Sequence, residues 1–191
     1  MNNTYEQPLP SEPLPALYEH LLVISPSENV WKEVMEIKEQ FNERYQHIQA
    51  IKSNPHIKLV NFGATPAKEE ILLLQIGAVA KSHGPFEVLL KGINHFKTHT
   101  IFIDVADQKP IVRLVQSLNI TLNLPPATSF FSWRPHMTIA KGLEENKFQQ
   151  AMTRLSSLKY SASFPADKIV LMKRAGKFDK YEIVKEFLLG Q

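Results

Sequence analysis

The sequence of 191 residues contains no cysteine. Disulfides and thiolate metal sites are therefore excluded, and a reducing compartment fits this composition. No apolar run is long enough to span a bilayer. The first 15 residues carry four prolines and lack a basic segment followed by an apolar one, so they do not resemble a secretory signal. We expect a cytoplasmic protein without membrane contacts.

Glycine is also scarce. The seven glycines are dispersed and form no phosphate-binding loop, and no serine lies in a nucleophile-elbow pattern. The formal net charge of +3 permits an anionic substrate but does not by itself indicate nucleic acid. Lys173, Arg174 and Lys177 form a small basic group, which we interpret as a solvated turn. The hydrophobic content of 43% is sufficient for one domain with a sizeable core.

Hydrophobic periodicity predicts strands mixed with helices. The strands are expected over 18–24, 56–62, 86–93, 98–105, 134–141, 160–164, 168–173 and 181–188. The helices are expected over 30–51, 67–82, 108–118 and 144–158, with turns over 94–97 and 176–179 and a loop over 122–130. This order predicts an α+β (mixed α/β) protein with helices covering sheets. We expect a flexible arm over residues 1–15 and a single bilobal domain over residues 16–191.

Two stretches repeat the order proline, histidine, apolar, polar, apolar. They are Pro55-His56-Ile57-Lys58-Leu59 and Pro135-His136-Met137-Thr138-Ile139. In a strand, the histidine and the polar residue two positions later share one face, about 7 Å apart, which suits one phosphate. The two histidines lie 80 positions apart (136 − 56). We therefore interpret the chain as two related halves that each deliver one histidine to a shared cleft.

The residue types in these stretches suit phosphoester cleavage. One group must remove a proton and another must donate one, and histidine suits both roles because its ordinary pKa is near neutral. Charge on the nonbridging phosphate oxygens needs donors, which a threonine hydroxyl or a lysine ammonium supplies. Either motif alone has many unrelated occurrences, so the matched pair carries the inference.

The paired motifs resemble those of the 2H phosphoesterase superfamily, which includes 2′-5′ RNA ligase-like proteins and cyclic phosphodiesterases. The second motif matches the family pattern fully, whereas Lys58 replaces the hydroxyl residue of the first. Phe96 before the 98–105 strand and Trp133-Arg134 before the second motif also fit the family layout. The resemblance implies a bilobal, pseudo-two-fold duplicated fold with two antiparallel sheets and helices on the outside.

The resemblance also implies an activity. It implies metal-independent hydrolysis of a 2′,3′-cyclic phosphate or a related RNA or nucleotide phosphodiester, with 2′-5′ RNA ligation as an associated activity. His56 and His136 would be the general acid and base, with Thr138 and Lys58 as substrate-binding residues. The implied partner is an RNA end or a small cyclic nucleotide, handled by a monomer without cofactors.

The lysine in the first motif leaves a second hypothesis open. Lysine can bind phosphate as a point charge, and it lowers the pKa of a neighbouring histidine. The same departure also fits a nucleotide- or RNA-binding module that keeps the cleft and has lost turnover. Whether the two imidazoles face each other across a cleft discriminates between the hypotheses.

Other residues have simpler interpretations. His95 and His99 have the spacing of a metal pair on a helix, but the alternation around them predicts a loop and a strand, so we expect no metal site. Arg134 and Lys141 either attract phosphate or are solvated strand ends, and both interpretations stay open. Core packing is expected for most of a group of aromatic residues that could also stack a base, namely Phe62, Phe130, Phe131 and Trp133. Surface or capping roles are expected for His20, His47 and His83.

Overall fold

The computed structural model describes residues 16–97 and 99–191. Its helices are α1 (Glu28–Tyr45), α2 (Pro66–Ser82), α3 (Lys109–Leu122) and α4 (Glu145–Leu155), with short 3-10 helices η1 (Ile48–Ala50) and η2 (Pro126–Thr128). Its strands are β1 (Tyr18–Ile24), β2 (Ile57–Ala64), β3 (Phe86–Phe96), β4 (Thr100–Val105), β5 (Ser129–Phe131), β6 (His136–Lys141), β7 (Ser161–Ala166), β8 (Lys168–Arg174) and β9 (Glu182–Leu188). The predicted mixture of helices and strands is confirmed. The expected arm over 1–15 lies outside the described residues.

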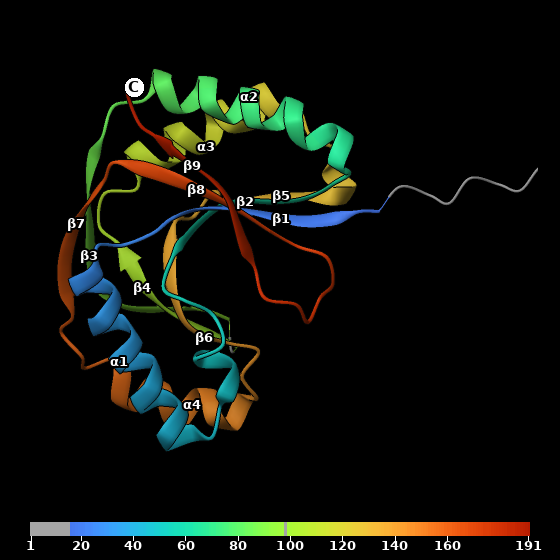
Figure 1. Ribbon diagram of the computed structural model, residues 1–191. Coiled ribbons are helices and arrows are strands. Elements are labelled where there is room, and N and C mark those ends of the chain that lie inside the picture. The colour runs from blue at the N-terminus through green and yellow to red at the C-terminus, as the bar shows by residue number, and fades with distance from the viewer. Residues whose placement is uncertain (1–15, 98) are drawn as a thin grey trace, which may run out of the picture.

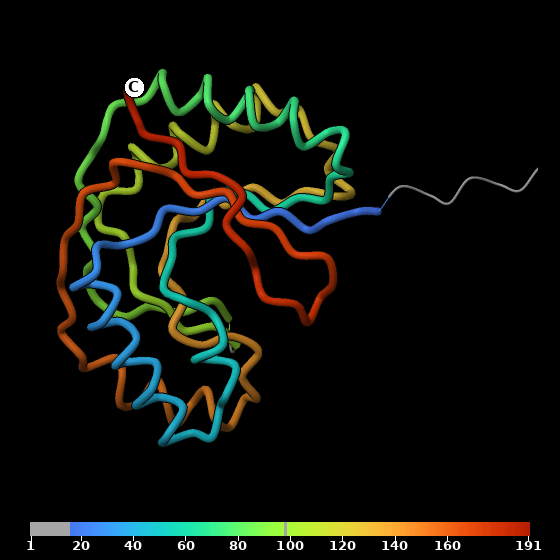
Figure 2. The backbone as a smooth tube through the Cα atoms, viewed as in Figure 1, coloured from blue at the N-terminus to red at the C-terminus, as the bar shows by residue number. Residues whose placement is uncertain are grey.

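The nine strands form one curled antiparallel sheet in the order β7-β3-β4-β6-β2-β1-β8-β9, with β5 beside β2 (Figure 1). Figure 2 shows the curled path of the same backbone. Helices α1 and α4 pack on the half that contains β4, β6 and β7, and α2 and α3 pack on the half that contains β2 and β9. The expected two antiparallel sheets are therefore present as two halves of a continuous sheet. The halves meet between β2 and β6 through one residue pair, Ile57 with Met137.

The motif strands lie where the halves join. Strands β2 and β6 are the inner edges of their halves and the middle pair of the whole sheet. The halves are also not consecutive pieces of chain. Strand β1 pairs with β2 in one half, whereas α1, which connects them, contacts β6 and β7 in the other.

Both motif strands contain a β-bulge at the same position. In β2 the extra residue against β1 is Leu59, immediately after Lys58. In β6 the extra residue against β4 is Ile139, immediately after Thr138. Both extra residues are buried, and so is the residue that follows each of them. Each strand therefore turns two consecutive apolar residues toward the helices, which shifts the alternation beyond the bulge.

Several boundaries differ from the sequence prediction. Helix α1 ends at Tyr45 rather than continuing to residue 51, because Gln46 adopts a left-handed conformation (φ 51°). Helix α3 continues to Leu122, and part of the predicted loop over 122–130 is strand β5. The predicted turn over 94–97 is strand as far as Phe96, because residues 94–96 pair with residues 100–102 of β4. Cross-strand pairing thus overrides the local turn preference of Asn94.

His20 is a core residue rather than a surface or capping residue. Its side chain is 1% exposed, and its ring stacks on Phe62 with a centroid separation of 5.1 Å. Its Nε2 lies 2.7 Å from Glu69 Oε2, and Lys173 Nζ donates to the same carboxylate at 2.9 and 3.0 Å. This network ties the start of α2 to β1 and β8. None of the helices in the described ranges is long and apolar enough to cross a membrane.

Candidate active site

The residue pair that joins β2 to β6 places the polar residues of both motifs on one face. The joining pair itself is buried on the side of the helices. One step away along the antiparallel strands, Lys58 lies opposite His136 and His56 lies opposite Thr138, on the inner side of the curl. His56 and His136 are thus diagonal neighbours. The backbones of diagonal residues are about 7–8 Å apart, a separation at which two histidine side chains can reach one phosphate.

The two histidines have the same orientation and the same tautomer. His56 Nδ1 donates to the carbonyl oxygen of Asn54 at 2.8 Å, and His136 Nδ1 donates to that of Arg134 at 2.7 Å. A carbonyl oxygen can only accept, so in each neutral ring the lone pair is on Nε2. The proline between each carbonyl and its histidine keeps the preceding residue extended, which explains why the same local geometry recurs.

The electrostatic surroundings of His56 are positive. The neighbouring charges are Lys38 from α1, Lys58 from β2 and Lys141 from β6. Burial has the largest effect and lowers the pKa of His56 to about 4, the hydrogen bond to the Asn54 carbonyl partly opposes it, and each of the three cations lowers the pKa further. His56 is therefore neutral at physiological pH, with Nε2 ready to accept a proton.

His136 has a mixed environment. Its ring packs against Phe96 and Phe102, with both centroid separations 4.8 Å, and the Arg134 guanidinium lies over the same two rings at 4.8 and 5.4 Å. Asp104 of β4 lies opposite His136 on the next strand. Burial lowers the pKa of His136, as do Lys58 and Arg134, whereas the Arg134 carbonyl and the Asp104 carboxylate raise it. The net effect lowers the pKa of His136, and the nearby Asp104 carboxylate opposes that decrease.

Lys58 lies on the floor of the site. Its ammonium is 4.3 Å from the centroid of the Phe130 ring, and burial and the charge of Lys141 lower its pKa. The bulges bring two more polar residues toward this face. Strict alternation from His56 would place Val60 there, but the bulge brings Asn61 instead, and Lys141 occupies the equivalent position in β6.

Besides Asn61, sequence reasoning missed three residues around the site: Lys38, Phe102 and Asp104. In the structure Lys38 occupies the buried row of α1 between Val34 and Phe41 and is only 1% exposed, whereas the sequence also offers the apolar Ile37 for that stretch of the row. The other two are ordinary strand residues of β4. Their contacts with His136 depend on which strand pairs with β6, and no local pattern specifies that pairing.

The remaining aromatic and histidine candidates differ in burial and in hydrogen bonding. Phe62 is buried, Phe131 packs on the core, and Phe130 and Trp133 are 59% and 51% exposed. His95 lies in β3, and its Nδ1 is 2.8 Å from the carbonyl oxygen of Lys97. His99 bonds to the neighbouring Thr100 instead. Within residues 16–97 and 99–191, no group of three or more histidine, cysteine or acidic residues could hold a metal ion.

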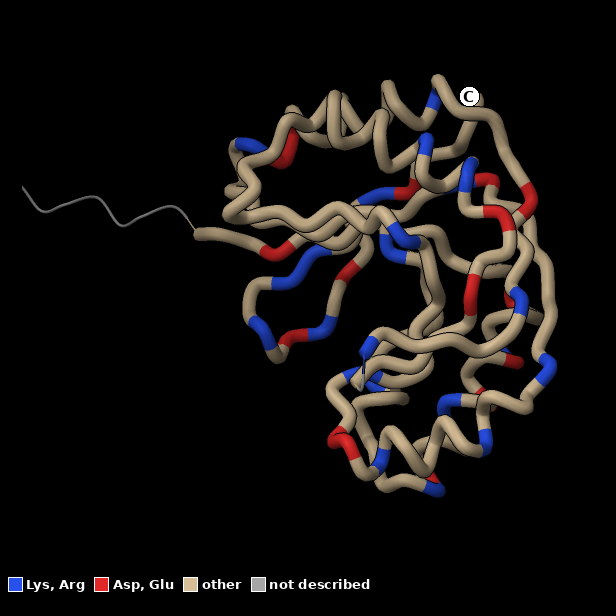
Figure 3. The backbone as a smooth tube through the Cα atoms, turned by 180° about the vertical axis from the view of Figure 1, so that it is seen from behind, with Lys and Arg blue, Asp and Glu red and all other residues tan. Residues whose placement is uncertain are grey.

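The hairpin between β8 and β9 is not a uniform basic patch. Lys173 is bound to Glu69, and Arg174 donates to Glu19. Acidic residues also follow along the hairpin, so both signs of charge alternate on it (Figure 3). Lys173 and Arg174 are therefore partly buried residues of β8, and of the three basic residues only Lys177 lies in the exposed turn that we expected.

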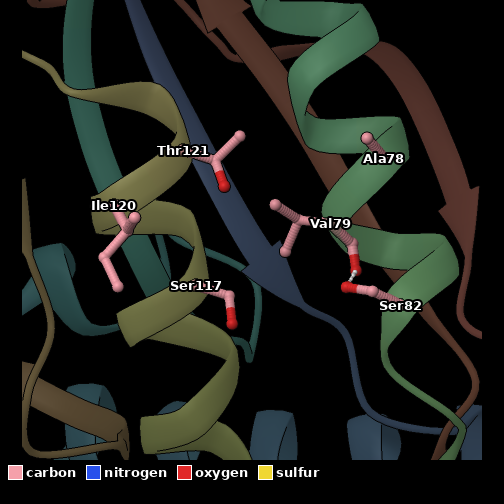
Figure 4. A pocket seen from close by; sticks show the side chains of 6 residues that line it. All are labelled: Ala78, Val79, Ser82, Ser117, Ile120 and Thr121. Carbon is pink, nitrogen blue, oxygen red and sulfur yellow. Dashed lines mark hydrogen bonds between the residues drawn. The ribbon is translucent and has the colours of Figure 1, made fainter.

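Two hollows on the helix side of the molecule lie apart from the motifs. One of about 290 Å³ lies between α2 and α3, where Ser82 Oγ donates to the Val79 carbonyl oxygen (Figure 4). The other, of about 420 Å³, lies between the start of α2, the end of β2 and the loop after α3. Neither is lined by His56 or His136.

Comparison with known structures identifies the same fold elsewhere. Escherichia coli LigT in complex with 3′-AMP has 16% identity and a TM-score of 0.63, covering 92% of this chain and 99% of LigT. TT0787 of Thermus thermophilus has 16% identity and a TM-score of 0.59, covering 90% and 98% of the two chains. Kluyveromyces marxianus Usb1 has 11% identity and a TM-score of 0.52, covering 93% and 100%. No curated protein sequence matches significantly.

The curled two-lobed sheet and the paired histidine motifs define a protein of the 2H phosphoesterase class. The profile of the 2′-5′ RNA ligase superfamily matches residues 26–178, which include both motifs. The chain belongs to this superfamily.

Proposed function

We propose that the protein is a metal-independent phosphodiesterase that hydrolyses a 2′,3′-cyclic phosphate or a related RNA or nucleotide phosphodiester, with His56 and His136 as general base and acid. One observation carries the proposal. The two histidines are diagonal neighbours on one face of the β2–β6 junction, and each has its Nδ1 hydrogen bonded away from that face. This arrangement leaves two Nε2 atoms available to one phosphate.

The unequal surroundings of the two rings support an assignment of roles. His56, surrounded by three cations, is the neutral base that takes a proton from water as the water oxygen attacks phosphorus. The bond from phosphorus to one ribose oxygen breaks, and protonated His136, opposite Asp104, donates its proton to that oxygen. After the step His56 is protonated and His136 is neutral, and exchange with solvent resets both.

The remaining polar residues suit the phosphate oxygens. Thr138 lies opposite His56 and Lys58 lies opposite His136, so a hydroxyl and an ammonium approach the nonbridging oxygens from the two halves of the sheet. If the attacking hydroxyl belongs to a second RNA end instead of water, the same groups would catalyse 2′-5′ ligation. A metal ion is not required in this scheme, because the proton transfers and charge stabilisation are assigned to side chains.

The similar structures support a nucleotide substrate. E. coli LigT has been solved with 3′-AMP, phosphate, NADP+ and ATP. All of these ligands contain phosphate, and all but phosphate itself carry it on a nucleoside, which is the chemistry proposed for this chain. The absence of cysteine fits the proposed action in the cytoplasm.

A second candidate function rests on Lys58. Because it replaces the hydroxyl residue of the first motif and lowers the pKa of both histidines, the protein could be a nucleotide- or RNA-binding module with little turnover. Such a module would bind the same ligands through the same face.

An activity screen tests both candidates. The purified protein is incubated with 2′,3′-cyclic nucleotides and 2′-5′-linked dinucleotides in the presence of a chelator, and products are separated by chromatography. We expect hydrolysis that chelator leaves unchanged and that the double variant His56→Ala/His136→Ala abolishes. Binding of these ligands without turnover would favour the binding module. Activity that chelator abolishes and zinc or manganese restores would overturn metal independence.

A further inference from the structure

Lys38 is a buried cation in the apolar face of α1. Its side chain is 1% exposed and continues the row formed by Val30, Val34, Phe41 and Tyr45, which otherwise carries apolar and aromatic side chains. None of the ion pairs among residues 16–97 and 99–191 includes it. A buried charge without an opposite charge is costly, so a leucine or methionine would suit the packing of this helix better.

The Lys38 ammonium is directed at the loop before the first motif. Nζ donates to the Ser53 carbonyl oxygen at 2.6 Å and lies 3.4 Å from Ser53 Oγ. The next carbonyl along the chain, that of Asn54, accepts the hydrogen bond from His56 Nδ1 at 2.8 Å. One peptide unit therefore separates the atom that Lys38 holds from the atom that fixes the tautomer of His56.

The loop between α1 and β2 needs such an anchor. After the left-handed Gln46, its only regular structure is the single turn η1. His47 Nε2 contacts the Lys141 carbonyl oxygen at 3.0 Å near its start, and Lys38 holds its end. Apart from the hydrogen bond of His56 itself to Asn54, the short contact to Ser53 is thus the side-chain hydrogen bond nearest to His56 in this loop.

We propose that Lys38 is a positioning residue for His56: its buried ammonium holds the Ser53 carbonyl, so that the Asn54 carbonyl keeps His56 in the tautomer with Nε2 directed at the substrate. The proposal rests on the proposed function of His56. Lys38 does not touch substrate, since it lies beneath the loop. Its positive charge also acts with Lys58 and Lys141 to keep His56 unprotonated.

The test compares Lys38→Met with Lys32→Met, a matched change on the exposed side of the same helix. The His56 ring is observed by ¹⁵N NMR through a pH titration, and turnover is measured on a 2′,3′-cyclic nucleotide. In Lys38→Met we expect a mixture of His56 tautomers, a raised His56 pKa, and turnover lowered by about 10-fold, as for groups that orient metal-bound histidines. Lys32→Met should have the same His56 tautomer, the same His56 pKa and the same turnover as the wild type.

Lys38→Gln is measured in parallel, because it retains an N–H donor without the charge. It should raise the pKa of His56 as well, with a smaller loss of the single tautomer. Unchanged His56 spectra and titration in both Lys38 variants would overturn the proposal. The NMR result does not depend on turnover, so failure of the proposed enzymatic function would be recognised separately, by absent activity in the wild type.

Discussion

Lys58 lies directly opposite His136 across the junction of β2 and β6, so the polar residue of each motif faces the histidine of the other. This crossed arrangement follows from antiparallel pairing around one buried pair. The lysine that departs from the family pattern therefore acts on both histidines, and it lowers the pKa of His56 and of His136 alike. His56, Lys58, His136 and Thr138 therefore lie together, and a substitution in one motif is expected to change the histidine pKa in the other.

Alanine substitutions should give graded losses. His56→Ala and His136→Ala should each lower turnover at least about 100-fold, the low end for removing a general acid or base. Thr138→Ala should cost about tenfold or less, because it removes one neutral hydrogen bond to phosphate. His99→Ala is the matched control, since Thr100 is the only hydrogen-bond partner of the His99 side chain among the described residues. Initial rates on a 2′,3′-cyclic nucleotide check the order, and an equal loss in His99→Ala would contradict it.

The pH dependence of kcat/KM should have an acidic optimum. His56 must be neutral as the base, so the rate falls as pH drops through its pKa of about 4. His136 must be protonated as the acid, and burial and nearby cations hold its pKa below its ordinary value of 6.5, so the rate falls as pH rises toward neutrality. A rate that still increases above pH 7 would exclude these roles.

Asp104→Asn should move one limb of that profile. The carboxylate opposite His136 raises the pKa of His136, so its removal should shift the basic limb to lower pH and leave the acidic limb in place. Asp107→Asn, a change at an exposed position beyond the end of β4, is the control. The prediction is wrong if the acidic limb moves instead, because Asp104 would then act on His56.

Lys58→Thr restores the family pattern and removes a cation from the site. We expect weaker substrate binding by about tenfold, as for losing a charged hydrogen bond, and a smaller dependence of binding on salt. Both limbs of the pH profile should move to higher pH, because Lys58 lowers the pKa of both histidines. Lys185→Thr is the control, since Lys185 is also a strand lysine over a phenylalanine ring. Unchanged affinity, salt response and pH profile in Lys58→Thr would show that Lys58 does not act on the site.

Glu69→Gln should destabilise the fold, and Glu69 lies outside the candidate active site. The hydrogen bonds from His20 and Lys173 outweigh the effect of burial and lower the pKa of Glu69. A lowered carboxylate pKa stabilises the native state above the unfolded value near 4.5, and this contribution is lost as pH falls through the folded value. We expect a loss of about 1–3 kcal/mol at pH 7 in urea unfolding, and a smaller acid sensitivity than in the wild type. Glu70→Gln, at an exposed position, should change neither quantity.

Repetition in the sequence determined much of the candidate site. The order proline, histidine, apolar, polar, apolar occurs twice, and in a strand that order fixes which side chains share a face. The proline also keeps the residue before it extended, and the carbonyl oxygen of that residue orients the imidazole. Both the face that a side chain occupies and this carbonyl orientation are set within a few residues of the motif. The α+β class and most elements followed from periodicity, and the strand over 18–24 has the predicted boundaries.

Only the tertiary structure decided how the two motifs meet. The Ile57–Met137 pair sets the register, and no local pattern relates strands separated by so much chain. The bulges after Lys58 and Thr138 then shift the alternation, so that Asn61 and Lys141 face the site although strict period-two spacing would exclude them. Asp104 lies opposite His136 only because β4 pairs with β6, and Lys38 holds the loop before His56 only because α1 packs beneath that loop. Short-range preferences act over a few residues, whereas these contacts depend on the packing of distant segments.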